Sequence, residues 1–250
     1  MPGTIALVSG GLDSAVMLGW SLDQDKKWEH IEEHNPFAPI HVLTFLYGSK
    51  HQDAESAASK NVVGAWLARY PESIVSHHLW QLPPEFFSGS ALVDDDIPLP
   101  QNRTMEEMTS GEPAPSYVPA RNSIFLSLAA GRADAWECDR IAYAAHYEDS
   151  PGYPDCTPQY LYSMQRTIQL GTARRVSLVA PFIMWSKSDI ILLGSRLRAP
   201  LHLTHSCYAG TTPACGVCDT CILRIESFKK ASIKDPIEYA IPIDWSDCDA

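Results

Sequence analysis

Six consecutive residues near the start of the chain have the types needed to bind an anion. They run Ser9-Gly10-Gly11-Leu12-Asp13-Ser14 and follow a short apolar run, Ile5 to Val8. Glycine lets the backbone turn tightly, so several N–H groups and two hydroxyls could face one point. Apolar residues at helical spacing come next, and the N-terminus of a helix attracts negative charge. The pattern therefore predicts a phosphate site between a strand and a helix.

This glycine turn differs from the common nucleoside-triphosphate loop, because the pattern G-x-x-x-x-G-K-[ST] is absent. Asp13 offers hard carboxylate oxygens, which suit Mg²⁺ and its bound waters. The alternative is that the glycines form only a turn, with Asp13 and Ser14 as residues that begin the helix.

Two basic residues at later strand-to-helix junctions could complete a phosphate site. Arg121 lies in Pro119-Ala120-Arg121-Asn122, and Lys187 ends the segment Pro181-Phe182-Ile183-Met184-Trp185-Ser186-Lys187. A forked guanidinium and a compact ammonium group would both stabilise charge that develops on a leaving phosphate. Taken alone, each residue is more often solvated or part of a helix cap. We predict that Asp13, Arg121 and Lys187 are catalytic and that residues 9–14 bind the nucleotide.

A group of acidic residues follows another predicted strand, at residues 140–144. It contains Glu148, Asp149 and Asp155, with Tyr153 between them. Ligands of open α/β sheets gather at the carboxyl ends of strands, where carboxylates could accept the N–H groups of a guanine-like base. Tyr153 could stack on such a ring. The alternative is a tight acidic turn built by the neighbouring glycine and proline.

Four of the seven cysteines lie close together near the end of the chain, with the spacing Cys207-x7-Cys215-x2-Cys218-x2-Cys221. Four thiolates suit a closed tetrahedral zinc site, and such a site is structural. An iron–sulfur cluster is the alternative, because C-x2-C-x2-C also begins the ferredoxin pattern. The next cysteine of that pattern is absent, so we favour zinc over iron–sulfur and over ordinary buried thiols.

Apolar periodicity predicts the elements that position these residues. Strands alternate with helices, which indicates a mainly parallel, doubly wound sheet with helices on both faces. The predicted strands are 5–8, 40–45, 74–79, 140–144 and 176–179, and the predicted helices are one after the glycine turn, 52–69, 121–136, 158–170 and 186–197.

Residues 88–116 interrupt this pattern with prolines, glycines and three consecutive aspartates. We interpret them as a surface insertion, either a functional lid or a loop without function. The expected organisation is one large domain over residues 1–200, which contains the phosphate site and this insertion, and a small C-terminal zinc-binding segment over residues 201–250.

The composition bears on partners and location. The 250 residues are 45% hydrophobic and carry a formal net charge of −11. An acidic chain without a basic cluster is not suited to nucleic acid as its main partner. No apolar run approaches the roughly 18 residues that span a bilayer, and no signal-peptide pattern begins the chain. We therefore expect no membrane segment and a cytoplasmic location.

These motifs together resemble the family of 7-cyano-7-deazaguanine synthases, within the N-type ATP pyrophosphatases. The likeness runs from Ile5 to about Tyr239. The segments that carry it are residues 9–14, 45–51, 118–122, 147–156 and 206–208, together with the cysteine group.

The resemblance implies an adenine nucleotide alpha hydrolase-like fold, ATP with Mg²⁺, a structural Zn²⁺ and a homodimer. It implies that 7-carboxy-7-deazaguanine is adenylated and that ammonia displaces AMP to give an amide. A second ATP then activates the amide oxygen, so that AMP leaves and the nitrile forms. The predicted substrate-binding residues are Tyr47, His51, Asn122, Glu148, Asp149, Tyr153 and Asp155.

Two departures from the family pattern leave other functions open. Ser49-Lys50 stands where the family usually has Gln-Arg, and Ala120 stands where it has glycine. A relative could stop at the amide or transfer the activated carboxylate to an amine on a protein or nucleic acid. A tRNA thiolase is a more distant alternative, against which the acidic charge argues. A non-catalytic nucleotide-sensing module is another, against which the intact loop, Arg121 and Lys187 argue.

Overall fold

A parallel sheet forms the centre of the computed structural model, which describes residues 3–23, 37–108, 113–149 and 152–248. Its strand order is β3-β2-β1-β4-β5, and every pairing is parallel. The predicted α/β class is confirmed. The strands are β1 (Gly3–Leu7), β2 (Ile40–Leu46), β3 (Ile74–Gln81), β4 (Cys138–Ala142) and β5 (Ser177–Val179).

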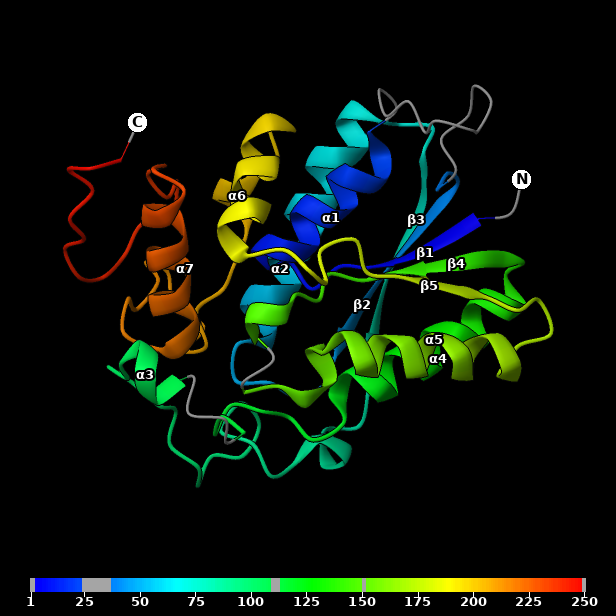
Figure 1. Cartoon of the computed structure of the whole chain (residues 1–250), viewed down its shortest axis with the longest axis horizontal. Coiled ribbons are helices and arrows are strands. Elements are labelled where there is room, and N and C mark those ends of the chain that lie inside the picture. Colours follow the sequence, from blue (N-terminus) through cyan, green and yellow to red (C-terminus); the bar gives the residue numbers. More distant parts are fainter. Residues whose placement is uncertain (1–2, 24–36, 109–112, 150–151, 249–250) are drawn as a thin grey trace.

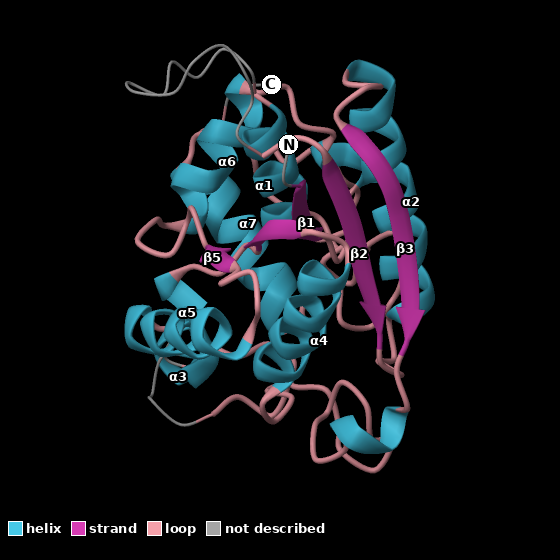
Figure 2. Cartoon of the chain, turned by 90° about the vertical axis from the view of Figure 1, so that its right-hand side faces the viewer, coloured by secondary structure: helices cyan, strands magenta, loops and turns pink. Residues whose placement is uncertain are grey.

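Helices cover both faces of the sheet, as Figures 1 and 2 show. One face carries α1 (Leu12–Leu22), α2 (Gln52–Arg69) and α6 (Lys187–Arg196). The opposite face carries α4 (Arg121–Ala135) and α5 (Pro158–Gly171). Because both faces are covered, β1 and β2 are mostly apolar rather than strictly alternating. The doubly wound arrangement is therefore also confirmed.

The ends of the helices follow local signals. A capping box begins α6, in which the Ser186 hydroxyl accepts the Asp189 N–H and the Asp189 carboxylate accepts the Ser186 N–H. The Thr157 hydroxyl caps α5 by accepting the Tyr160 N–H, with proline at the first helical position. The capping box fixes where α6 starts, and with it the position of Lys187.

Two helices were not among the predicted elements. They are α3 (Met105–Met108) and α7 (Asp219–Lys230), which lies beside α6 in Figure 1. Arg224 is 1% exposed on the inner face of α7, so the apolar stripe of this helix is interrupted. The described residues also contain four 3-10 turns, at Pro84–Phe87, Tyr147–Asp149, Pro154–Cys156 and Leu201–Leu203.

The strands that follow β1 in the sequence are added first on one side of β1 and then on the other. From β1 the chain builds outward through β2 to β3, and later it returns to the other side for β4 and β5. At such a switch point the loops at the carboxyl ends of neighbouring strands separate and leave a crevice. The fold therefore places the loop after β1 next to the loop after β4.

Part of the predicted surface insertion is buried. Ser90, Ala91 and Leu92 have no exposed surface, and Leu92 packs in a cluster with Tyr47 and Phe87. The Lys50 N–H donates to the Leu92 carbonyl at 2.7 Å, which ties this stretch to the loop after β2. The sequence interpretation as a surface segment is therefore wrong for these residues, because a short apolar run anchors the segment beneath the cavity described below.

A polar network joins α2 to the sheet. The Thr44 hydroxyl donates to the Val8 carbonyl at 2.6 Å and lies 2.9 Å from Nε2 of His77, while the Ser59 hydroxyl lies 2.6 Å from that of Thr44. Burial, with smaller contributions from His78 and Lys60, lowers the pKa of His77 from 6.5 to about 4. His77 is therefore neutral in the folded protein over most of the acidic range.

This pKa predicts a pH-dependent stability. The unfolded chain binds a proton at His77 near pH 6.5 and the folded chain only near pH 4, so the stability is complete above 6.5 and is lost as the pH falls to 4. The slope is at most about 1.4 kcal/mol per pH unit, reduced by partial exposure of the ring. In chemical denaturation, His77→Gln should flatten this dependence, whereas the exposed control His202→Gln should retain it. Equal slopes in the two variants would contradict the assignment.

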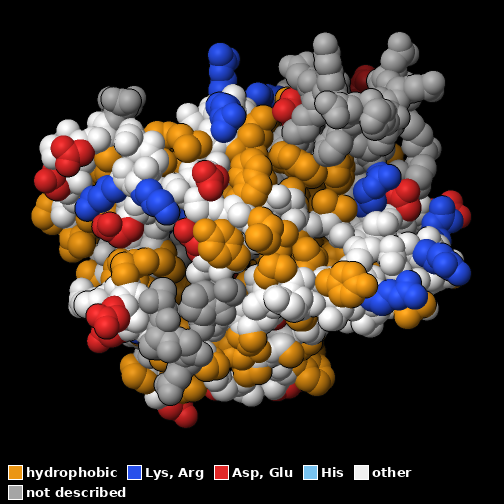
Figure 3. All heavy atoms as spheres, viewed as in Figure 1, with side chains coloured by type: hydrophobic (Ala, Val, Ile, Leu, Met, Phe, Trp, Pro, Cys, Tyr) orange, Lys and Arg blue, Asp and Glu red, His pale blue; other side chains and the backbone are white. Residues whose placement is uncertain are grey.

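The surface is mixed in character. Figure 3 shows acidic and basic side chains interspersed with apolar ones over the face that it draws. Within the described ranges, no helix is both long and apolar enough to cross a membrane.

Candidate active site

A cavity of about 280 Å³ opens at the carboxyl ends of β1, β2 and β4, at the switch point of the sheet. Most of the predicted site residues lie on its wall. They are Ser9, Gly11, Leu12, Asp13, Ser14, Tyr47, His51, Arg121, Asn122, Glu148, Tyr153 and Lys187. Gly10 and Asp155 are not among the lining residues.

The loop between β1 and α1 is held by its own hydroxyl groups. The Ser9 hydroxyl accepts the Gly11 N–H at 3.1 Å and lies 3.2 Å from the Ser14 hydroxyl. The Ser14 hydroxyl donates to the Gly11 carbonyl at 3.0 Å. No side chain caps the first turn of α1, so its N–H groups remain available to an anion.

Gly10 forms the back of this loop rather than its open side. Its φ is +93°, and a Cβ there would lie 2.6 Å from both the Glu55 carbonyl oxygen and the Ser59 nitrogen. Only glycine permits this backbone to rest directly on α2. The close approach fixes the distance between the loop and the first turns of α2.

Asp13 faces two basic side chains from other elements. Its Oδ2 lies 3.3 Å from Nζ of Lys187 and 3.7 Å from Nε2 of His146, and its Oδ1 is buried without a hydrogen-bond partner. Burial alone would raise the pKa of this carboxyl, but Lys187 and then His146 hold it well below its usual value. Asp13 is therefore ionised, with one oxygen available to a cation.

Arg121 enters the cavity from the first position of α4. It donates to the Tyr47 hydroxyl at 3.3 Å, and no described carboxylate forms an ion pair with it. Burial raises the pKa of Tyr47, and Arg121 opposes this only in part, so the phenol stays neutral. The guanidinium charge is thus left to a ligand.

Ala120, the departure from the family pattern before Arg121, has a left-handed backbone with φ 55°. This conformation costs a non-glycine residue about 1–2 kcal/mol, whereas glycine adds about 0.5–1 kcal/mol of unfolded-state entropy. We expect Ala120→Gly to raise the free energy of unfolding by roughly 0.5–1 kcal/mol, measured by chemical denaturation. Ala57→Gly, in an exposed and regular part of α2, should lower it. Equal losses in both variants would refute the strain at Ala120.

Of the acidic residues after β4, Glu148 lines the cavity and Asp155 does not. Oε2 of Glu148 accepts the Lys187 N–H at 2.7 Å, which places this carboxylate at the N-terminus of α6. Asp155 is 6% exposed and accepts the Asn122 N–H at 3.2 Å, so it holds the start of α4 instead of lining the cavity. The side chain of Asp149 lies outside the described part of the structure. Tyr153 bonds through its hydroxyl to Ser116 and Tyr208.

Several residues in or beside the cavity were missed by the sequence reasoning. His146, which contacts Asp13 from beside the cavity, follows the end of β4, so the strand-end rule could have identified it. Glu55 and His205 come from the first turns of α2 and from the loop before the cysteines, and nothing local marks them. Arg103 comes from the predicted insertion and donates to Asp219, the first residue of α7, at 2.8 Å.

The loop that carries His205 and Tyr208 is anchored to α7 through Arg224, which also forms a buried ion pair. Arg224 bonds twice to Asp235, at 2.7 and 3.0 Å, and both side chains are almost fully buried. The same guanidinium donates to the hydroxyls of Thr204 and Ser206. The C-terminal segment therefore positions one wall of the cavity.

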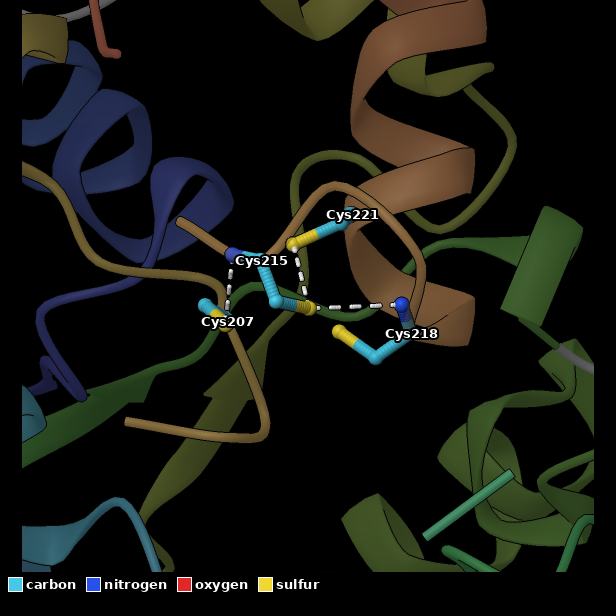
Figure 4. A group of neighbouring side chains, drawn as sticks. All are labelled: Cys207, Cys215, Cys218 and Cys221. Atoms are coloured by element: carbon cyan, nitrogen blue, oxygen red, sulfur yellow. Dashed lines mark hydrogen bonds between the residues drawn. The ribbon is translucent and has the colours of Figure 1, made fainter. Parts of the chain in front are cut away.

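The four cysteines of the predicted metal site converge beside this wall, as Figure 4 shows. Their sulfur atoms lie within 4.8 Å of one another, and none is in a disulfide. Tetrahedral Zn–S bonds of about 2.3 Å imply sulfur separations of roughly 3.8 Å, so the cluster fits a metal ion. The N–H groups of Cys215 and Cys218 donate to the sulfurs of Cys207 and Cys215. Such bonds stabilise thiolates.

The sequence is similar to proteins of one family. A family model described as "Queuosine biosynthesis protein QueC" matches residues 3–232. A 7-cyano-7-deazaguanine synthase from Nostoc punctiforme is 39% identical over 241 residues, which cover 94% of this chain and 99% of that protein. The synthase from Oceanobacillus iheyensis is 35% identical over 94% of this chain and 97% of its own length. The one from Halobacterium salinarum is 34% identical over 94% and 95%, respectively. The chain therefore belongs to the QueC family of queuosine biosynthesis proteins.

Proposed function

We propose that this enzyme converts 7-carboxy-7-deazaguanine and ammonia to 7-cyano-7-deazaguanine, with two ATP molecules as co-substrates. The relatives reported above carry the name of that synthase. The observation that supports the proposal most directly is the convergence of the loop after β1, Asp13, Lys187 and Arg121 on one cavity. Phosphate-binding groups and a carboxylate for a metal thus share a single site.

In this proposal the loop 9–14, Lys187 and Arg121 bind the phosphates of ATP. The loop supplies N–H groups and hydroxyls, and the two cations balance the charge that builds on the leaving pyrophosphate. Asp13 fits Mg²⁺, because its Oδ1 is a buried hard oxygen without a hydrogen-bond partner. When bound, Mg²⁺ would neutralise phosphate charge during the displacement.

The chemistry requires the same cavity twice. In the first half, a carboxylate oxygen of the substrate attacks the α-phosphorus, pyrophosphate leaves, and an acyl adenylate forms. Ammonia then attacks the acyl carbon, AMP leaves with the C–O electron pair, and the amide remains. In the second half, the amide oxygen attacks the α-phosphorus of a second ATP, and a second pyrophosphate leaves. Loss of AMP and of the remaining amide protons gives the nitrile.

Aromatic and amide side chains support a flat, polar substrate. Tyr47 and Tyr153 line the cavity with Asn122, and Phe125 stacks on Phe45 at its floor with ring centroids 4.5 Å apart. A deazapurine ring suits such walls, because aromatic faces stack and the amide can bond to the edge of the ring.

We propose zinc as the ion of the four-cysteine cluster. Four thiolates without an open position favour a structural zinc ion. The cluster lies between the loop at Cys207 and the start of α7, so the ion would hold the C-terminal segment against the cavity wall. Its contribution would be to folding rather than to the reaction.

The test is product formation by the purified protein with Mg-ATP, ammonium and 7-carboxy-7-deazaguanine, followed by mass spectrometry. Accumulating nitrile supports the proposal. Amide without nitrile would leave the alternative that the enzyme stops halfway or transfers the acyl group to another amine. Lys50, one departure from the family pattern, donates to the Asp94 and Ile97 carbonyls and does not line the cavity, so it gives no support to that alternative.

A further inference from the structure

One carboxylate in the cavity differs from the others in its pairing. Four described carboxylates line the wall, and three of them form an ion pair with lysine or arginine. These pairs are Asp13 with Lys187, Glu148 with Lys230, and Asp219 with Arg103. Glu55 is the fourth, and no described lysine or arginine forms an ion pair with it.

Glu55 is instead held by a histidine one helical turn earlier. Its Oε1 lies 3.4 Å from Nε2 of His51, whose ring is 4% exposed and packs against Tyr208 with ring centroids 5.5 Å apart. Nδ1 of His51 is buried without a hydrogen-bond partner. The ring is therefore fixed by packing, and its contact with Glu55 orients the carboxylate.

The position of Glu55 relative to the phosphate loop is equally fixed. The backbone carbonyl of Glu55 is one of the atoms against which Gly10 rests. Glu55 and the loop residues Ser9, Gly11 and Asp13 also line the same cavity, so a group bound by this carboxylate shares that cavity with whatever the loop binds.

We propose that Glu55 is the ammonium site of this enzyme, with His51 as its positioning residue. The inference rests on the proposed function, which needs a small cation beside an acyl adenylate. Glu55 holds NH₄⁺ and accepts one of its protons. The nitrogen lone pair then forms the C–N bond while the C–O bond to the phosphate breaks, and AMP leaves with that electron pair. The second surplus proton passes to water.

The charge state of Glu55 agrees with this role. Burial raises the pKa of its carboxyl, but His51, Arg121 and His205 together bring the pKa below the usual value. Tyr47, which also faces it, stays neutral because burial raises its pKa. Glu55 is therefore anionic at neutral pH.

The test is Glu55→Gln, with three measurements on one preparation. The apparent KM for ammonium should rise about 10- to 100-fold, as expected for the loss of a charged hydrogen bond. Carboxylate-dependent exchange of labelled pyrophosphate into ATP should be unchanged. Hydroxamate formation with hydroxylamine, which is neutral at neutral pH, should also be retained. Asp53→Asn removes an exposed acid from the same turn of α2 and should alter none of these.

Other outcomes would overturn the inference. An equal loss with ammonium and hydroxylamine would show a structural role for Glu55. A raised KM for 7-carboxy-7-deazaguanine with an unchanged KM for ammonium would show that Glu55 binds the edge of the deazapurine ring instead of ammonium. Absence of pyrophosphate exchange in the unmutated enzyme would instead refute the proposed function, and the ammonium site with it.

Discussion

Replacing Lys187 by methionine is expected to lower the rate of adenylation about 10²- to 10³-fold, the effect of removing one charge-stabilising donor from a reaction centre. Lys187 lies on the cavity wall, 13% exposed, with Nζ 3.3 Å from Asp13. Its charge would stabilise the leaving pyrophosphate. It also keeps Asp13 ionised, because Lys187 is the main group that lowers the pKa of that carboxyl.

The measurement is carboxylate-dependent pyrophosphate exchange, together with circular dichroism to verify the fold. Lys229→Met is the matched control, because among the described residues Lys229 forms an ion pair only with the exposed Glu226 on α7. Adenylation within ten-fold of the unmutated rate in the folded Lys187 variant would remove Lys187 from the proposed chemistry.

Replacing Cys218 by serine is expected to release the bound metal and to lower the unfolding temperature sharply. Cys218 is 1% exposed, and its sulfur is one of the four that converge. Zinc binding contributes about 10–16 kcal/mol to the folding of small zinc peptides, while a whole domain has a net stability of about 5–15 kcal/mol. Loss of even part of this binding free energy should therefore lower the unfolding temperature by a large amount.

Metal content per chain, by elemental analysis, and thermal unfolding check this prediction. Cys248→Ser, in the tail beyond α7 and outside the cluster, should keep the metal and the stability. Equimolar zinc retained by Cys218→Ser would contradict the four-cysteine site. Iron with visible absorbance in the unmutated protein would replace zinc by an iron–sulfur cluster.

Local signals explain the parts of the fold that the sequence could predict. The alternation of apolar strands and helices placed α2 at Gln52–Arg69 and the start of α5 at Pro158, in agreement with the structure. The glycine turn after β1 and the cysteine spacing are also local, so their residues meet as expected. Such features depend on a few neighbouring residues and not on how distant elements pack.

The features that the sequence could not predict depend on tertiary packing. Glu55 faces the cavity only because Gly10 and Trp66, which donates to the Ala15 carbonyl, set the rotation of α2. In sequence it cannot be distinguished from a solvated helical glutamate. Arg103 meets Asp219 across 116 positions of the chain, a contact that no periodicity indicates. Asp155 is the opposite case. Its position after a strand predicted a substrate contact, but its carboxylate accepts the Asn122 N–H at the start of α4.

In the proposed reaction, one cavity activates the same carbon twice through adenylation. The most direct test of this reaction uses 7-carboxy-7-deazaguanine labelled with ¹⁸O in both carboxylate oxygens, together with ammonium and Mg-ATP, and mass spectrometry of AMP and the deazapurine. Nitrile without label is expected, together with two AMP molecules per nitrile, each with one ¹⁸O. Amide that keeps one ¹⁸O as the final product, or unlabelled AMP, would contradict the proposed reaction.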